Sequence, residues 1–288
     1  MSLNLVPLPA LCRLFIAAFL AVVLASPALP GSPAPAEGEG ETFRVMNYNI
    51  RHCRGLDDVL DPERTAAVIR EQEADVVGLQ EVDRGVRRTD RRDLPAELGE
   101  LTGMTSIFEK NHPVQGGEYG NAILTRFPHR DVKNTHLPMI GSTEQRGVLQ
   151  AVITIHGQDT LFLNTHIAHR REGEEERLAS VDEFERILKE NEAGADLPVL
   201  FVGDFNAVPG SAPYERMAEL LEDTWIEAGK GSGATVPVRE PRRRIDYVWV
   251  SRDAPFTPTR AWIPYTEASD HLPIVVEFTM QPKDDESR

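Results

Sequence analysis

The 288-residue chain contains only two cysteines, Cys12 and Cys53, so no disulfide framework can stabilise it. Cys12 lies in an apolar N-terminal segment, and removal of that segment would leave Cys53 alone. Common short zinc motifs are excluded, because neither HExxH nor CxxC occurs. A P-loop and a GxSxG elbow are also absent, which argues against nucleoside-triphosphate and serine-hydrolase chemistry. Stability must therefore come from a hydrophobic core.

The sequence also lacks a clear membrane span, which needs about 20 apolar residues. The apolar stretch LCRLFIAAFLAVVLA covers residues 11–25 and carries one charge, Arg13. A Pro/Ala/Gly-rich stretch follows, in which Ala34 and Ala36 form the A-x-A pattern of a signal-peptidase site. We therefore expect residues 1–28 to be a signal peptide or an uncleaved anchor, and 29–41 a linker. Both alternatives predict a secreted, periplasmic or cell-surface protein.

One folded domain is expected over residues 42–281, followed by a flexible tail at 282–288. The formal net charge of −15 argues against a protein that binds nucleic acid by charge alone. Two basic islands interrupt the acidic chain, DRGVRRTDRR at 83–92 and VREPRRRIDY at 238–247. Taken alone, such islands are typical of solvated loops. We expect a monomer.

The hydrophobic pattern predicts many strands with interspersed helices. The strand-like runs are 43–50, 75–82, 121–127, 147–155, 159–167, 198–205, 244–250 and 273–280. A helix is expected from Asp61, a capping residue followed by Pro62, and further helices at 94–103, 172–192 and 213–223. This order favours two packed sheets, each covered outside by helices.

Polar side chains gather where the apolar runs end. They are Asn47, Asn49, Glu81, Thr165, His166, His169, Asp204, Asn206, Asp246, Ser269, Asp270 and His271. Any one of them is explained by turn formation. The set is harder to explain in that way, because many oxygen ligands with hardly a lysine among them require a compensating cation. Hard oxygen ligands suit Mg²⁺ or Mn²⁺ better than zinc.

Seven motifs follow one another between Phe43 and Phe278: MNYNIR, LQEVDR, YGNAILTRFP, NTHIAH, GDFNAVP, RIDYVWV and SDHLPIV. In this order they resemble the endonuclease/exonuclease/phosphatase superfamily. The resemblance implies an α/β fold, a four-layer α-β-β-α sandwich of two mixed sheets like that of deoxyribonucleases. It also implies an enzyme that hydrolyses phosphate esters by in-line attack of water, helped by a divalent cation.

The resemblance further implies roles for the matching residues. Glu81, Asn49 and Asp270 correspond to metal ligands for Mg²⁺ or Mn²⁺. Asp246 and His271 resemble a pair in which a carboxylate orients the imidazole that accepts a proton from water.

Five other residues correspond to positions around the phosphate. Asp204 would orient the nucleophile or protonate the leaving oxygen, and His166 would bind the phosphoryl oxygens or assist the leaving group. Neutral donors are expected from Asn206 and Asn121, and a phosphate-binding guanidinium from Arg146. Gly203 is expected to let backbone and substrate approach closely.

The substrate is less well defined, since one catalytic set serves many phosphate esters in this superfamily. The basic islands adjoin Glu81 and Asp246, so we expect Arg87 and Arg88 above all to bind anionic groups of the substrate. The amino-acid sequences of the motifs are similar to those of secreted bacterial members of the sphingomyelinase and phosphoinositide-phosphatase kind. A lipid headgroup or small organophosphate is therefore expected, with membrane contact only through the substrate or an uncleaved signal.

Two alternatives remain at this point. An extracellular DNA or RNA endonuclease would use the same residues, although the acidic chain does not favour nucleic acid as a partner. A catalytically inactive binding protein would usually have lost the general-base histidine or the metal-binding glutamate, and this chain keeps both Glu81 and His271.

Overall fold

The structure is a computed structural model that describes residues 40–282. The predicted signal peptide or anchor at 1–28, all but the last two residues of the predicted linker, and residues 283–288 of the predicted tail lie outside the described residues. Within residues 40–282, no helix is both long enough and apolar enough to cross a membrane.

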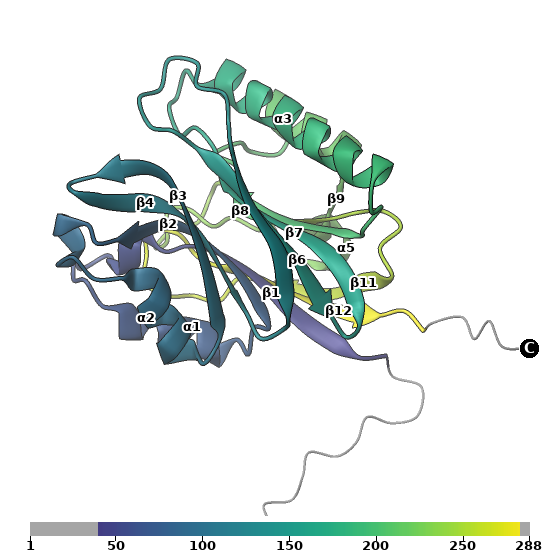
Figure 1. Cartoon of the computed structure of the whole chain (residues 1–288), viewed down its shortest axis with the longest axis horizontal. Helices are drawn as coiled ribbons and strands as arrows, with labels where there is room; N and C mark the ends of the chain where they lie inside the picture. The colour runs from purple at the N-terminus through teal and green to yellow at the C-terminus, as the bar shows by residue number, and fades with distance from the viewer. Residues whose placement is uncertain (1–39, 283–288) are drawn as a thin grey trace, which may run out of the picture. The chain divides into compact units, whose positions relative to one another are not determined.

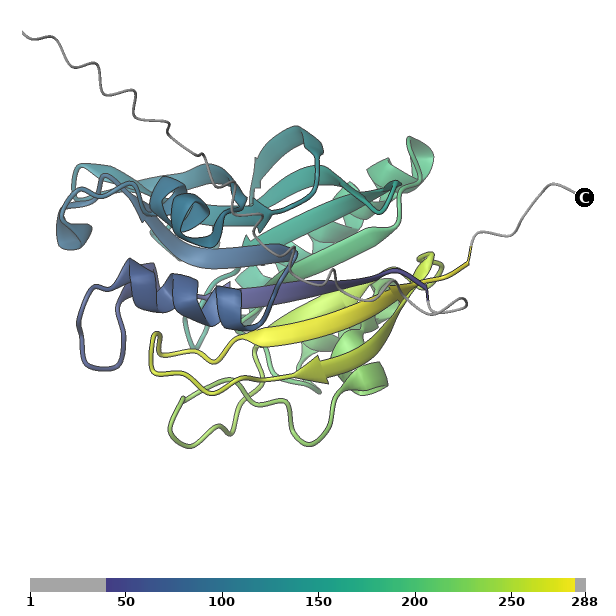
Figure 2. The same ribbon diagram turned by 90° about the horizontal axis from the view of Figure 1, so that it is seen from below.

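Two sheets of six strands form the centre of the domain (Figures 1 and 2). The first has the order β11-β12-β1-β2-β4-β3, and β1 runs parallel to β2 but antiparallel to β12. Its strands are β1 Thr42–Asn49, β2 Val76–Arg84, β3 Thr105–Val114, β4 Gly117–Thr125, β11 Phe256–Trp262 and β12 Ile274–Met280.

The second sheet has the order β5-β6-β7-β8-β10-β9 and is also mixed, because β7 and β8 are parallel while β8 and β10 are antiparallel. Its strands are β5 His129–His136, β6 Gly147–Ile155, β7 Gln158–His166, β8 Val199–Asp204, β9 Glu222–Asp223 and β10 Asp246–Val250.

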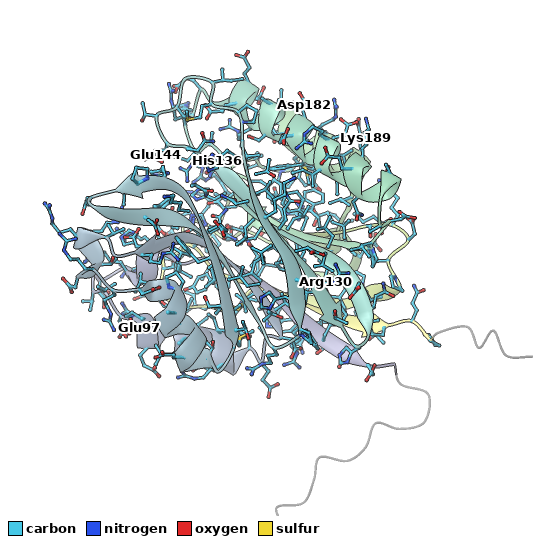
Figure 3. All side chains as sticks on the ribbon, in the orientation of Figure 1. Glu97, Arg130, His136, Glu144, Asp182 and Lys189 are labelled. Atoms are coloured by element: carbon cyan, nitrogen blue, oxygen red, sulfur yellow. The ribbon has the colours of Figure 1, made fainter. Side chains whose placement is uncertain are left out.

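Helices cover the outer face of each sheet, which confirms the predicted four-layer sandwich (Figure 1). Helices α1 Pro62–Glu71 and α2 Leu94–Thr102 pack on the first sheet, and α3 Glu174–Ala193 and α4 Ala212–Leu220 on the second. A short helix, α5 Thr224–Ala228, follows β9. The outer side of α3 carries charged residues such as Asp182 and Lys189 (Figure 3). As predicted, α1 begins after Asp61, whose carboxylate accepts a hydrogen bond from Arg64 N at 3.0 Å.

The space between the sheets is filled by apolar side chains, including the stacked rings of Phe43 and Phe278. Each fully buried large apolar side chain there stabilises the fold by about 1.5–3 kcal/mol. Cys53 is buried against the outer face of the first sheet, and burial raises the pKa of its thiol to about 12. It is therefore an inert packing residue rather than a reactive thiol.

The eight strand-like runs predicted from the sequence correspond to the eight inner strands of the two sheets. The prediction missed four strands, β3, β5, β9 and β11, and these are the four sheet edges. The sequence pattern therefore located the covered part of each sheet and not its borders.

Buried amide side chains connect the two sheets below the strand ends. Gln80 Nε2 donates to Asn164 Oδ1 at 2.6 Å and to Asn47 Oδ1 at 2.7 Å. Asn47 Nδ2 donates to the carbonyl of Gly203, and Asn164 Nδ2 donates to the carbonyls of Leu79 and Ala122. Because every hydrogen bond of this group is shielded from water, it fixes one sheet against the other.

Contacts with the neighbouring strand explain why position 203 is a glycine. A Cβ atom at this position would lie 2.6 Å from the carbonyl oxygen of Thr165 and 2.8 Å from Thr165 Cγ2. The missing side chain therefore allows β8 to pack closely on β7, and the close approach of substrate stays a prediction.

Candidate active site

A cleft of about 280 Å³ opens at the strand ends. Its lining residues are Glu81, Arg88, His112, Val114, Tyr119, Glu144, Arg146, His166, His169, Asp204, Asn206 and His271. Strand register explains part of this set, because His166 pairs with Asp204 across β7 and β8, and Asp204 pairs with Asp246 across β8 and β10. Three residues distant in sequence are thus brought side by side.

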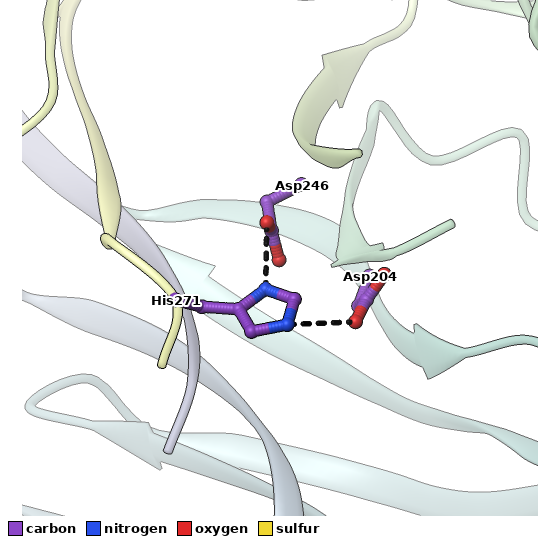
Figure 4. A group of neighbouring side chains, drawn as sticks. All are labelled: Asp204, Asp246 and His271. Atoms are coloured by element: carbon purple, nitrogen blue, oxygen red, sulfur yellow. Dashed lines mark hydrogen bonds and ion pairs between the residues drawn. The ribbon is translucent and has the colours of Figure 1, made fainter. Parts of the chain in front are cut away.

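His271 is held by a chain of hydrogen bonds (Figure 4). Its Nδ1 lies 2.9 Å from Asp246 Oδ2, and its Nε2 lies 3.8 Å from Asp204 Oδ2. The same Asp246 oxygen accepts a hydrogen bond from the buried hydroxyl of Thr235. Because a carboxylate accepts and does not donate, Nδ1 carries the proton and Nε2 is directed towards Asp204 and the cleft.

The loop that carries His271 is fixed on two sides. Ser269 Oγ donates to the carbonyl of Asn49 at 2.7 Å, and the backbone N–H of Leu272 donates to the carbonyl of Thr235. The loop therefore cannot move without breaking contacts with β1 and with the segment before β10.

Electrostatics set the protonation of this group. Burial alone would lower the pKa of His271, but the negative charges of Asp246 and Asp204 raise it to about 10. Burial and the charge of Asp246 raise the pKa of Asp204. Perturbed titratable groups in a cleft are a recognised sign of a functional site.

Glu81 enters the cleft through an unusual backbone conformation. Its φ is +59°, and the β2–β4 register shifts between Leu79 and Val82, so Glu81 lies at a β-bulge. A non-glycine residue in the left-handed region costs of order 1–3 kcal/mol and persists where the surroundings impose it. The bulge re-aims the Glu81 carboxylate, which accepts a hydrogen bond from Asn49 Nδ2 at 3.2 Å.

Two of the predicted metal ligands, Glu81 and Asp270, are neighbouring carboxylates. Burial and the nearby charge of Asp270 raise the pKa of Glu81, so two carboxylates lie close enough to repel. A divalent cation would relieve this repulsion, and the carboxylate oxygens of Glu81 and Asp270 fit one. Asn49 fits less simply, because Nδ2 faces Glu81 and Asp204 while Oδ1 accepts from Arg51 N. In this arrangement Asn49 positions carboxylates, and it would ligate only after its amide turned.

A second group that could hold a cation is formed by Asp204, Asp246 and His271, which offer ligand atoms within 4.8 Å of one another. In this group the Nδ1 atom of His271 is already engaged by Asp246. The pair Glu81 and Asp270 is therefore the better candidate for a hard cation.

Arg146 is the best-connected cation of the cleft. It is only 4% exposed, and its Nη1 lies 3.3 Å from the hydroxyl of Tyr119 and 3.1 Å from His166 Nδ1. Its Nη2 donates to Glu144 Oε2 at 2.8 Å and lies 3.0 Å from His169 Nδ1. Glu144 belongs to the loop between β5 and β6 (Figure 3).

The two arginines predicted to bind anionic groups lie in different environments. Arg88 lines the cleft, and its Nε and Nη2 bind both oxygens of the buried Asp83 at 2.7 and 2.8 Å. Its Nη1 has no protein partner within residues 40–282 and is free to bind an anion. Arg87 is exposed and does not line the cleft, so the structure does not bring it to the site.

The two predicted asparagine donors also differ. Asn206 lines the cleft with φ +46°, and its N–H donates to Asp204 Oδ1 at 3.0 Å. Asn121 is buried in β4, where its Nδ2 donates to the carbonyl of Gly147 in the other sheet. Its expected contact with phosphate is therefore not supported, and Asn121 helps to connect the sheets.

Sequence reasoning missed several residues of the site. Tyr119 and His112 come from the β3–β4 hairpin, Glu144 from a loop, and Thr235 from the segment before β10. The signal for Tyr119 was present, since it precedes Asn121 by two residues in a motif already noted. Glu144 precedes the predicted Arg146 by two residues, whereas nothing in the sequence around Thr235 indicated that it would lie here.

Comparison with known proteins gives consistent matches. Residues 46–271 match the profile described as the Endonuclease/Exonuclease/phosphatase family. Uncharacterized protein YbhP of Escherichia coli (strain K12) is 28% identical over 262 residues, which cover 85% of this chain and 99% of YbhP.

Two solved structures share the fold. The endonuclease/exonuclease/phosphatase from Beutenbergia cavernae DSM 12333 has 25% identity and a TM-score of 0.68, with 83% of this chain and 72% of that chain covered. The mannosyl-6-phosphatase Bt3783 of Bacteroides thetaiotaomicron VPI-5482 has 20% identity and a TM-score of 0.69, with 83% and 100% covered. The motif-based prediction is thereby confirmed for the family, whereas the sphingomyelinase-like subgroup stays a prediction.

Proposed function

Because this chain belongs to the endonuclease/exonuclease/phosphatase family, we propose that it is an exported, metal-dependent hydrolase of a small phosphate ester. One observation carries the proposal above the others. His271 is hydrogen-bonded to buried Asp246 and faces Asp204 in the same cleft that receives the Glu81 carboxylate. An inactive relative has no need to keep this arrangement.

In the proposed reaction, His271 accepts the proton of the attacking water at Nε2. Asp246 holds the imidazole in the required tautomer and stabilises the positive charge that the ring gains, with Thr235 fixing Asp246 in turn. The acidic neighbours that raise the pKa of His271 make it a strong base, at the cost of a smaller unprotonated fraction at neutral pH.

Asp204 lies between His271 Nε2 and His166 Nε2, at 3.8 and 3.5 Å. Its raised pKa suits a group that orients the nucleophile or gives a proton to the leaving oxygen. Members of the family are typically dependent on divalent metals, and Glu81 with Asp270 would hold Mg²⁺ or Mn²⁺ here. When bound, the cation supplies neutralisation of phosphoryl charge.

The shape and polarity of the cleft favour a small substrate. Its volume of about 280 Å³ lies just below the usual range for ligand sites, about 300–1,000 Å³. Tyr119 is buried, and the guanidinium carbons of Arg88 and Arg146 lie 5.7 and 5.9 Å from its ring centre, so the ring is not open for stacking with a nucleic-acid base. We therefore place a lipid headgroup or small organophosphate before nucleic acid. The N-terminal residues 1–36 support action outside the cytoplasm, and we propose a monomer.

The test is a substrate panel incubated with the full-length protein and Mg²⁺, with chelator as control. The panel holds bis-nitrophenyl phosphate, sugar phosphates, inositol phosphates, phosphatidylinositol phosphates, sphingomyelin and plasmid DNA. We expect chelator-sensitive release of phosphate or headgroup from a small ester or lipid, with intact DNA. Nicked plasmid would favour the extracellular nuclease, and no turnover across the panel would favour a binding protein.

A further inference from the structure

The hydrogen bonds of Arg146 use every Nη hydrogen of its guanidinium. A guanidinium has five N–H donors and no acceptor, and four of the five lie on Nη1 and Nη2. Nη1 faces Tyr119 and His166, and Nη2 faces Glu144 and His169. Only Nε–H remains without a protein partner among residues 40–282. Binding of a phosphate through the usual two-pronged contact would therefore require loss of existing bonds.

These contacts determine where two histidines carry their protons. Since Arg146 can only donate, His166 Nδ1 and His169 Nδ1 must accept, and neither nitrogen carries a hydrogen. A neutral imidazole protonated at one nitrogen then has its hydrogen on Nε2. Burial, and next the positive charge of Arg146, lower the pKa of His166 well below its ordinary range, which agrees with a neutral ring.

The free Nε2–H of His166 faces the reacting part of the cleft, 3.5 Å from Asp204 Oδ2. His169 is exposed and lines the same cleft. Both rings are therefore donors there, and neither can serve as a base through Nε2. His271 has the opposite arrangement, with its proton on Nδ1 against Asp246.

We infer that Arg146 is a positioning residue that holds His166 and His169 as neutral Nε2–H donors, and that it does not bind the substrate phosphate itself. This replaces the phosphate-binding role expected from the sequence. The substrate oxygens are bound instead by the two imidazole N–H groups, with His166 next to Asp204. The consequence for catalysis rests on the proposed phosphoesterase function, whereas the tautomers can be measured without any substrate.

The first experiment is ¹⁵N–¹H correlation spectroscopy of the imidazole nitrogens in full-length protein with chelator. The His166→Gln and His169→Gln variants identify the two rings. We expect both rings to show a protonated Nε2 and an unprotonated Nδ1. In Arg146→Met, His166 should become a mixture of tautomers. A protonated Nδ1 in wild-type His166 would overturn the inference.

A matched control separates this effect from loss of a buried arginine. Arg244 is also buried and pairs with Asp223, but it does not line the cleft. Arg244→Met should lower the melting temperature while the His166 and His169 signals keep the wild-type pattern. If Arg146→Met does not fold, Arg146→Lys replaces it, because a lysine keeps the charge but cannot reproduce the planar fork that reaches both rings.

The second experiment measures kinetics on whichever panel substrate is hydrolysed. Loss of a preorganised donor lowers kcat by about 10²–10³-fold, so we expect Arg146→Met to lower kcat by that order with KM within about threefold. His166→Gln, which keeps an amide N–H near the Nε2 position, should retain at least about tenfold more kcat than His166→Ala.

The outcomes are distinguishable. If Arg146→Met raises KM with unchanged kcat, Arg146 binds substrate and the inference is wrong. Wild-type kcat in Arg146→Lys with unchanged tautomers would also overturn it. If nothing in the panel is hydrolysed, the proposed function fails, and the imidazole spectra still decide whether Arg146 sets the two tautomers.

Discussion

The cleft has an acidic region around His271 and a basic region around His166, and the two regions shift the pKa of a histidine in opposite directions. In the acidic region, Asp246 and Asp204 raise the pKa of His271 to about 10 despite burial. In the basic region, burial and the charge of Arg146 lower the pKa of His166. Both rings face the same Asp204 oxygen, at 3.8 and 3.5 Å. The partner at Nδ1, a carboxylate or a guanidinium, decides which ring gains a proton and which only donates.

One cleft can therefore provide both a proton acceptor and fixed donors from the same kind of side chain. In the proposed reaction, the acidic region accepts a proton at His271 and offers the carboxylate oxygens of Glu81 and Asp270 to a cation. The basic region offers N–H groups whose directions are set before substrate arrives, which is the condition for strong electrostatic stabilisation of a transition state.

The largest effect is expected from removing the base of the acidic region. His271→Ala should lower kcat/KM by about 10²–10⁴-fold, the range for loss of a general base. Circular dichroism and thermal melting should show a folded protein. Loss of less than about tenfold would show that proton transfer does not depend on His271, and the distinction between the two regions would lose its basis.

A smaller effect is expected from Glu81→Gln, which removes one charge from the acidic region and keeps its shape. Because the amide is a weaker ligand for a hard cation, the Mg²⁺ concentration for half-maximal activity should rise at least about tenfold. Mg²⁺ titration of the rate measures this, and saturating Mg²⁺ should recover part of the activity. An unchanged Mg²⁺ requirement would show that Glu81 is not a ligand.

In the basic region, Arg88→Gln is expected to raise KM about tenfold, since a charge-assisted hydrogen bond contributes about 1.5–3 kcal/mol. Arg87→Gln is the matched control, because it removes the same charge one residue away from an exposed position outside the cleft. Its KM should stay within about twofold. Equal effects of the two variants would show that charge near the cleft matters and position does not.

Arg88→Gln also leaves the buried Asp83 carboxylate without its partner, which costs stability. The double variant Asp83→Asn/Arg88→Gln should restore part of the melting temperature while KM stays high. If KM recovers together with stability, the contribution of Arg88 is structural.

The smallest effect concerns His52, whose Nδ1 lies 4.0 Å from Glu81 Oε2. Burial, and next the charges of Arg88, Arg54 and Arg51, lower its pKa to about 3. Below its ordinary pKa of about 6.5 only the unfolded state binds the proton, so stability is lost as pH falls from about 6.5 towards 3.

Wild type should therefore lose about 1–2 kcal/mol more unfolding free energy between pH 7 and pH 5 than His52→Asn. Asparagine tolerates the φ of +46° found at this position, so the comparison isolates the titration. Urea unfolding at the two pH values measures the difference. Parallel losses in both proteins would mean that His52 takes up its proton over the same pH range in the folded and unfolded states.

Prediction from sequence succeeded where side chains are covered on both faces and failed at the sheet borders. β5 illustrates the reason, because HRDVKNTH is exposed along most of its length and carries no apolar alternation. An edge strand has one hydrogen-bonding neighbour and is often polar, which protects it from pairing with other chains. β11 contains Pro258 at a register shift, a feature that argues against a strand when only the sequence is considered.

The same distinction applies to the site. Asp204 and Asp246 were located because they end and begin inner strands, whose register brings them together. Glu81 was located because it lies near the end of the apolar run 75–82, although the structure places it at a bulge within β2. The basic region was only partly located, because Tyr119 and His112 depend on the edge hairpin β3–β4. The sequence also showed nine arginines in two islands without showing their partners. Five of these charges are neutralised within the fold, by the pairs Arg84 with Glu118, Arg88 with Asp83, Arg92 with Glu97, Arg239 with Glu267 and Arg244 with Asp223.

The amide group of Asn47, Gln80 and Asn164 has a mechanical consequence. Glu81 and Asn49 belong to one sheet, whereas His166, Asp204 and Asp246 belong to the other. The candidate site therefore depends on the relative position of two sheets that could slide past each other. Apolar packing resists separation of the two sheets but gives little resistance to sliding, because the hydrophobic effect is not directional. The hydrogen bonds from Gln80 to Asn164 and from Asn47 to Gly203 are directional and oppose sliding of one sheet against the other. They therefore fix the distance between the residues that the two sheets contribute to the site.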